Sequence, residues 1–183
     1  LGPDGEKMSK SRGNVINPDE VKLAQGADAT RLYICFMGPF DKDKPWATSG
    51  IDGVRRFLDR VWRLVSDENG QLIAADEEVP PDLEKVLHKT IKKVTEDIPQ
   101  FGFNTSISQM MIFSNALQKA PAVSRATVLA FLQLLAPFAP HLAEELWQRL
   151  GEKPSIQNAP WPKFDPARLK ATELKMVFQV DGK

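Results

Sequence analysis

Apolar residues recur at three- and four-residue steps from residue 49 to residue 151, and this spacing limits most of the chain to amphipathic helices. The longest stripe begins at Ser49 and includes Ile51, Val54, Phe57, Leu58, Val61, Trp62 and Val65. Four more stripes follow, with expected starts at Asp82, Asn104, Pro121 and Pro140. Five helices joined by short connections predict a mainly α fold built on a helical bundle.

Two shorter helices are expected before this bundle. Asn17 and Glu20 form a capping-box pattern for a helix that ends at Gly26. Asp28 is expected to cap a second helix, which stops before Gly38. These helices connect an N-terminal loop to the bundle.

The composition of the chain after the bundle is no longer typical of amphipathic helices. Residues 151–166 are rich in proline, and Trp161 and Phe164 are the expected anchors of this segment. Residues 173–180 alternate in the manner of a strand, and Asp181-Gly182 is a hairpin-turn signal without a following strand. We therefore expect a piece of a longer protein in three parts. These are a loop with its helical connection (1–48), the bundle (49–153) and a linker leading into a truncated α/β domain (154–183).

Charge and cysteine content exclude several kinds of protein. Lys plus Arg and Asp plus Glu both number 24, so any binding of nucleic acid must use local basic patches. Cys35 is the only cysteine, which rules out an intrachain disulfide and, with two histidines, predicts no protein-bound metal. His141 follows a helix-starting proline and is expected to make a structural hydrogen bond. The absence of a signal peptide or a long apolar run predicts a cytoplasmic protein with no membrane contact.

The residues Lys7-Met8-Ser9-Lys10-Ser11 form a loop with glycines on both sides. Lysines on a hinged loop can meet negative charge that develops only in a transition state, which raises the rate of a reaction on a polyphosphate. The loop is not a P-loop, because no G-x-x-x-x-G-K-[ST] string occurs in the chain. An ordinary polar loop explains these five residues about equally well. The wider string at residues 5–18, GEKMSKSRGNVINP, favours the functional interpretation.

That wider string resembles the KMSKS loop of class I aminoacyl-tRNA synthetases. The resemblance implies that the loop closes over ATP, with Mg²⁺ on its phosphates, while an amino-acid carboxylate attacks the α-phosphate. Lys10, and after it Lys7, would stabilise the charge on the leaving pyrophosphate. Ser9 and Ser11 would hold the shape of the loop or donate hydrogen bonds to phosphate.

Later segments narrow the resemblance. Residues 46–62 resemble the helix that opens the anticodon-binding domain of bacterial leucyl-tRNA synthetases, and residues 103–108 and 134–147 resemble later helices of that domain. Residues 177–183 resemble the entry to the small C-terminal domain of that family. The resemblance implies a ligase that activates leucine with ATP to leucyl-adenylate and transfers it to tRNA(Leu). The HIGH motif of the family is absent, so this piece is expected to be inactive alone.

Two basic helical faces are candidates for contact with tRNA. Arg56, Arg60 and Arg63 share one face, where contact with tRNA phosphates and a solvated face are equally supported. The second face is expected to be solvated. It consists of Lys85, Lys89, Lys92 and Lys93.

Two alternative functions stay open at this point. The chain could be a stand-alone module that binds tRNA or protein, with an idle loop. It could also belong to a valyl, isoleucyl or methionyl synthetase, because the stretch Pro-Phe-Ala-Pro-His at residues 137–141 is shared with those relatives.

Overall fold

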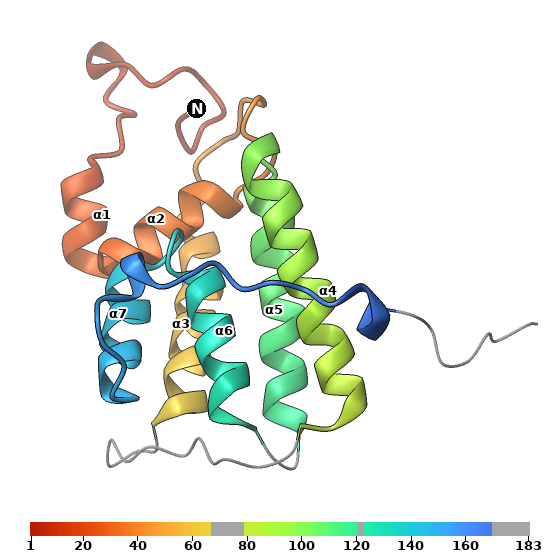
Figure 1. The fold of residues 1–183 in the computed structure, drawn as a ribbon. Helices are drawn as coiled ribbons and strands as arrows, with labels where there is room; N and C mark the ends of the chain where they lie inside the picture. Colours follow the sequence, from red (N-terminus) through yellow and green to blue (C-terminus); the bar gives the residue numbers. More distant parts are fainter. Residues whose placement is uncertain (67–78, 121–122, 170–183) are drawn as a thin grey trace, which may run out of the picture.

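The computed structural model describes residues 1–66, 79–120 and 123–169, and this part of the chain is helical (Figure 1). The prediction of a mainly α bundle is confirmed. The expected strand at 173–180 and the turn at 181–182 lie outside the described residues. The α-helices are α1 (Pro18–Gln25), α2 (Ala27–Phe36), α3 (Ser49–Val65), α4 (Pro81–Asp97), α5 (Phe103–Lys119), α6 (Arg125–Leu135) and α7 (Pro140–Arg149). The 3₁₀ turns are η1 (Lys10–Arg12), η2 (Ile98–Gln100), η3 (Ile156–Asn158) and η4 (Pro166–Leu169).

The helices form one packed body below the N-terminal loop (Figure 1). α4 and α5 make an antiparallel pair, and α2 lies across the end of the bundle nearest the loop, where it contacts α1, α3, α5 and α7. α3 contacts α5 and α7 as well as α2. The two short helices that follow the loop, α1 and α2, are therefore joined to the bundle through the contacts of α2. Within the described ranges, none of the helices has the length and apolar character needed to cross a membrane.

The start of α1 follows the sequence prediction. The Asn17 side chain accepts a hydrogen bond from the backbone N–H of Asp19 at 3.0 Å, and it donates one to Glu20 at 3.3 Å. These contacts satisfy a donor that the first turn of a helix leaves without an intrahelical partner. The helix ends where Gly26 adopts φ +89°, as its glycine predicted.

Three predicted helix starts were wrong. Asp82 and Asn104 lie inside the first turns of α4 and α5 rather than at their caps. In the first turn their polar side chains still face the positive end of the helix dipole, so sequence pattern alone does not separate the two positions. α6 begins at Arg125, later in the chain than the expected start at Pro121, which lies outside the described residues; the cap is Ser124, whose hydroxyl accepts a hydrogen bond from the backbone N–H of Thr127 at 3.2 Å.

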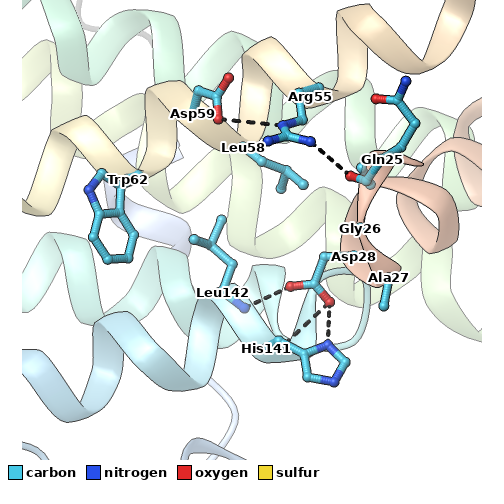
Figure 2. Close-up of a pocket in the computed structure, with 11 residues that line it drawn as sticks. Gln25, Gly26, Ala27, Asp28, Arg55, Leu58, Asp59, Trp62, His141 and Leu142 are labelled. Carbon is cyan, nitrogen blue, oxygen red and sulfur yellow. Dashed lines mark hydrogen bonds and ion pairs between the residues drawn. The ribbon is translucent and has the colours of Figure 1, made fainter. Parts of the chain in front are cut away.

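Asp28 does not cap its own helix, which corrects the sequence prediction (Figure 2). Its carboxylate accepts backbone N–H groups at the start of α7, from His141 at 3.3 Å and from Leu142 at 2.7 Å. It also lies 2.8 Å from His141 Nδ1, so the expected structural hydrogen bond of this histidine is present. A side chain of α2 thus supplies the cap that α7 lacks locally.

The Asp28 cap predicts a stability effect. Asp28→Ala leaves the first N–H groups of α7 without their acceptor, so the free energy of unfolding of the 183-residue chain should fall by about 1–2 kcal/mol. Urea titration followed by circular dichroism measures this change. Asp43→Ala, in an exposed loop, is the matched control and should leave the stability within about 0.5 kcal/mol. Equal effects of the two substitutions would contradict a capping role for Asp28.

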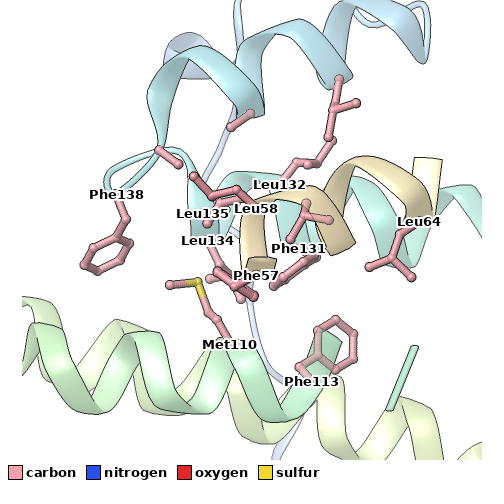
Figure 3. Close-up of a cluster of buried hydrophobic side chains, with 14 of the residues drawn as sticks. Phe57, Leu58, Leu64, Met110, Phe113, Phe131, Leu132, Leu134, Leu135 and Phe138 are labelled. Carbon is pink, nitrogen blue, oxygen red and sulfur yellow. The ribbon is translucent and has the colours of Figure 1, made fainter. Parts of the chain in front are cut away.

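A continuous apolar core joins the helices (Figure 3). Phe113 of α5 and Phe131 of α6 meet edge to face with ring centroids 5.3 Å apart, and Met110 is fully buried beside them. The apolar stripe of α3 is the largest contribution from one helix. Its buried members are Ile51, Val54, Phe57, Leu58, Val61, Leu64 and Val65.

The proline-rich segment after α7 runs over α6 and α4 as an extended strap (Figure 1). Trp161 donates its indole N–H to Thr95 Oγ1 at 2.8 Å, and Phe164 packs partly buried against the core. The backbone N–H of Asp165 donates to His88 Nδ1 at 2.9 Å. The predicted anchoring of this segment by Trp161 and Phe164 is confirmed.

Candidate functional site

The lysine loop is a tight turn with a glycine at its end. The backbone N–H of Arg12 donates to the Ser9 carbonyl at 3.1 Å, and the N–H of Gly13 donates to the Lys10 carbonyl at 3.2 Å. Gly13 adopts φ +67°, a conformation that costs other residues more because of their Cβ atom. Backbone geometry therefore turns the chain immediately after Lys10.

Asn14 holds the two sides of this loop together. Its Oδ1 accepts the backbone N–H of Ser9 at 2.8 Å. Its Nδ2 donates to both carboxylate oxygens of Asp4, at 3.0 and 3.2 Å, and reaches the Lys7 carbonyl at 3.4 Å. We call Asn14 and Asp4 the loop clamp. The sequence pattern did not single out either residue, although an asparagine directly after a glycine is a frequent turn residue.

The Asp4 carboxylate is held in its ionised form by hydrogen bonds. The backbone N–H of Glu6 has the largest effect in lowering its pKa, and the Asn14 amide adds to it. Because the pKa in the folded chain lies below the ordinary value, the contribution of Asp4 to the loop is fully present above the ordinary pKa. It is lost as the pH falls through the lowered pKa. The clamp therefore stays intact throughout the neutral range.

Both loop lysines are exposed to solvent. Within residues 1–66, 79–120 and 123–169, no carboxylate oxygen lies within 4.0 Å of the ammonium of Lys7 or Lys10. Arg12, in contrast, pairs with Glu6 at 3.0 Å. Two ammonium groups without a carboxylate partner leave positive charge available for an incoming polyphosphate.

The serines of the loop lie next to each other. Ser9 Oγ and Ser11 Oγ are 2.8 Å apart, so one hydroxyl donates to the other. This contact spans the start of η1 and supports a shape-holding role. Each hydroxyl keeps further hydrogen-bonding capacity, so the geometry is also compatible with donation to phosphate.

Met8, which lies between the two loop lysines in the sequence, is half-buried. It lines a cleft of about 320 Å³ together with Ile34 and Met37 from the end of α2, and with Phe40 and Trp46 from the loop that follows. This cleft therefore lies between the lysine loop and the end of α2.

The three candidate arginines lie on α3, which runs away from the lysine loop (Figure 1). Arg56 and Arg63 are exposed, and Arg63 Nε donates to the Asp59 carbonyl at 3.2 Å. Arg60 is half-buried, with its guanidinium 6.0 Å from the Phe57 ring centroid. The structure therefore does not bring the arginines and the lysine loop into one pocket.

A cleft of about 390 Å³ lies between α2, α3 and α7, and none of the three candidate arginines lines it (Figure 2). Arg55 crosses it, donating to the Gln25 carbonyl at 3.1 Å and lying 4.0 Å from an Asp59 carboxylate oxygen. The Asp59 carboxylate thus pairs with Arg55 and not with one of the three candidate arginines. Outside this cleft, the guanidinium of Arg149, the last residue of α7, lies 4.7 Å from the Trp62 ring centroid.

The lysine face of α4 is partly neutralised. Lys93 pairs with the buried Asp97 at 2.7 Å, and Lys92 lies 3.9 Å from Glu96. Asp97 also accepts the Thr105 hydroxyl at 2.5 Å, which ties α4 to α5. These contacts support the interpretation of this face as solvated and structural. No cluster of three or more His, Cys, Asp or Glu suited to a metal ion occurs in the described ranges.

Family comparison agrees with the geometry of the loop and bundle. Residues 82–183 match the anticodon-binding domain of tRNA ligases, and residues 1–47 match the class I tRNA synthetases for I, L, M and V. Because the first match covers more than half of the chain, the chain belongs to the anticodon-binding domain family of tRNA ligases.

Two individual relatives are leucine–tRNA ligases. The chain is 56% identical, over all 183 residues, to leucine–tRNA ligase from Bdellovibrio bacteriovorus, and it spans 23% of that protein's length. It also matches the LeuRS of Agrobacterium radiobacter K84 (agnB2), solved as a ternary complex with tRNA and LeuAMS. That match has 34% identity and a TM-score of 0.80, and it covers 93% of this chain and 23% of the other. The resemblance to leucyl-tRNA synthetases is thereby confirmed.

The loop clamp predicts a measurable change in the titration of Asp4. Asn14→Ala removes the amide donor but leaves the Glu6 N–H, so the pKa of Asp4 should rise part of the way toward its ordinary value. Carbon-detected NMR titration of the side-chain carboxyl groups in the 183-residue chain measures this pKa. An unchanged pKa would show that Asn14 does not contact the carboxylate.

Proposed function

We propose that this chain is part of a leucine–tRNA ligase. In the whole protein, leucine and ATP give leucyl-adenylate and pyrophosphate, and the leucyl group then passes to tRNA(Leu). The observation that carries this proposal is 56% identity along the whole chain to a leucine–tRNA ligase. The exposed, unpaired loop lysines within the described part support it. The division of the chain at residues 48 and 153 into loop connection, bundle and linker belongs to the same proposal.

Lys10 and Lys7 are the proposed catalytic residues of the first step. As the bond between the α- and β-phosphates breaks, negative charge grows on the leaving pyrophosphate, and two ammonium groups stabilise it. Ser9 and Ser11 keep the turn in shape and offer hydroxyl donors to the phosphates. Mg²⁺ would arrive bound to the ATP phosphates, since the two loop carboxylates, Asp4 and Glu6, are already paired with Asn14 and Arg12. The reaction is assigned to the cytoplasm.

The bundle is the proposed tRNA-contacting part. Arg56 and Arg63 of α3 are exposed and suited to phosphate contacts, which fix the position of the tRNA without reading its bases. Arg60 belongs to the same helical face, but its packing against Phe57 leaves it the least accessible of the three.

Two other functions are distinguishable. A stand-alone tRNA- or protein-binding module would show salt-sensitive tRNA binding by the isolated chain and no amino-acid-dependent exchange in the whole protein. A valyl, isoleucyl or methionyl ligase would exchange with its own amino acid. The test is ATP–pyrophosphate exchange by the full-length protein with leucine, isoleucine, valine and methionine offered separately. Exchange with leucine alone is the expected result.

Lys10→Ala in the full-length protein should lower kcat for leucine-dependent exchange by about a hundredfold, with the KM for leucine nearly unchanged. The reason is that the ammonium meets charge present in the transition state and absent from bound leucine. Lys163→Ala, an exposed lysine in the C-terminal strap, is the control and should keep full activity. Loss of rate and leucine affinity by equal factors would exclude a transition-state role for Lys10.

The double substitution Arg56→Gln and Arg63→Gln should weaken tRNA binding by the full-length protein. The slope of log K against log salt should become shallower by about 1 to 2, because each lost phosphate contact removes about 0.9 or less from the slope. Filter binding of tRNA(Leu) between low and physiological salt measures the slope. Lys153→Gln serves as the control, and an unchanged slope in the double variant would assign these arginines to a solvated face.

A further inference from the structure

We infer that Asn14 is a positioning residue for the first step of the reaction, acting through Lys7 and Lys10. This inference rests on the proposed function, because it concerns how the lysines of the proposed ATP site are held. Asn14 itself need not touch ATP. Its role is to keep the backbone on both sides of the lysines in the conformation that directs their side chains to one place.

The contacts of Asn14 surround the lysines. The Lys7 carbonyl, 3.4 Å from Nδ2, belongs to one of the two lysines, and the Ser9 N–H, 2.8 Å from Oδ1, directly precedes the other. The remaining donation goes to Asp4, which in turn accepts the Glu6 N–H at 3.0 Å. One amide thus links three successive parts of the loop. Only a side chain with both a carbonyl oxygen and an NH₂ group can make this set of contacts.

Apart from the half-buried Met8, this part of the chain is not held by apolar burial. The η1 turn contains no buried residue, and both lysines are exposed. Without a buried side chain to fix it, the conformation of the turn depends on hydrogen bonds and on Gly13. Removal of Asn14 therefore releases the segment that carries both lysines, while the bundle beneath it keeps its core.

Gly2 provides a second, independent observation. A Cβ atom built on Gly2 would lie 2.7 Å from Asp4 Oδ1 and 3.0 Å from Asn14 Nδ2. The backbone N–H of Gly2 donates to the Glu6 carbonyl at 2.7 Å, so the backbone at Gly2 passes close to the loop clamp. The absence of a side chain at this position is what allows Asp4 and Asn14 to meet there.

The test exchanges donor and acceptor in the clamp. Asn14→Asp places a carboxylate where an amide nitrogen lies 3.0 Å from an Asp4 oxygen, so the two like charges repel and open the loop. Adding Asp4→Asn restores a complementary pair with the roles reversed. In this double variant, the carboxylate introduced at position 14 still accepts the Ser9 N–H, and only the long 3.4 Å donation to the Lys7 carbonyl is lost. Asn115→Asp, the same change at an exposed position of α5, is the matched control.

The readouts are leucine-dependent ATP–pyrophosphate exchange and transfer of leucine from preformed leucyl-adenylate to tRNA, both in the full-length protein. Asn14→Asp should lower kcat for exchange about tenfold or more, with KM for leucine and the transfer step unchanged. The double variant should recover most of the lost exchange rate, and Asn115→Asp should match the unaltered protein. Recovery by the reversed pair separates positioning from a general loss of folding.

Three results would overturn the inference. One is normal exchange by Asn14→Asp, another is an equal loss in exchange and transfer, and the third is no recovery in the double variant. Each of these requires that the unaltered protein exchanges with leucine, which is measured first. No exchange by the unaltered protein would instead overturn the proposed function, and this inference with it.

Discussion

Burial of the apolar stripe of α3 is the constraint on which the rest of the structure depends. α3 contacts α2 on the side of the lysine loop, and α5 and α7 on the side of the bundle. Seven of its side chains are buried, including Phe57 at 0% exposure, so the helix cannot separate from either group without exposing a large apolar surface to water. This burial makes a single body of the helical connection and the bundle. The Asp28 cap of α7 adds a polar contact at the same junction.

The loop and the bundle are held by different interactions. The bundle relies on apolar packing, which is non-directional and insensitive to small changes in charge. The lysine loop relies on a few directional hydrogen bonds around Asn14, and its lysines stay in solvent. A loop of this kind can move toward a polyphosphate at little cost to the core, because no buried side chain must leave its place. We therefore expect stability and catalytic rate to respond to separate sets of substitutions.

The sequence predicted most of the features that depend on neighbours along the chain, although it misplaced the starts of α4, α5 and α6. Each of three features is defined by residues close together in the sequence: the stripe of α3, the Asn17 cap and the lysine motif. The structure contains the first two as predicted. The sequence did not predict the contacts that a polar side chain makes with a residue far away in the chain. Asp28 caps a helix more than a hundred residues away, and Asn14 meets Asp4 only because the loop folds back. Such pairings leave no periodic signal in the sequence.

By itself, then, the sequence determined the helical class, the identity of the lysine loop and its family, because local spacing and motif chemistry suffice for these. The tertiary structure alone decided which polar groups from distant parts of the sequence meet. It placed Asp28 at α7, brought the Arg55 guanidinium to the Gln25 carbonyl of α1 and joined Trp161 to Thr95 of α4. It also left Lys7 and Lys10 without carboxylate partners in the described part of the chain. The physical reason is that charged and polar groups interact over a few ångströms of space, and the folded path sets those distances.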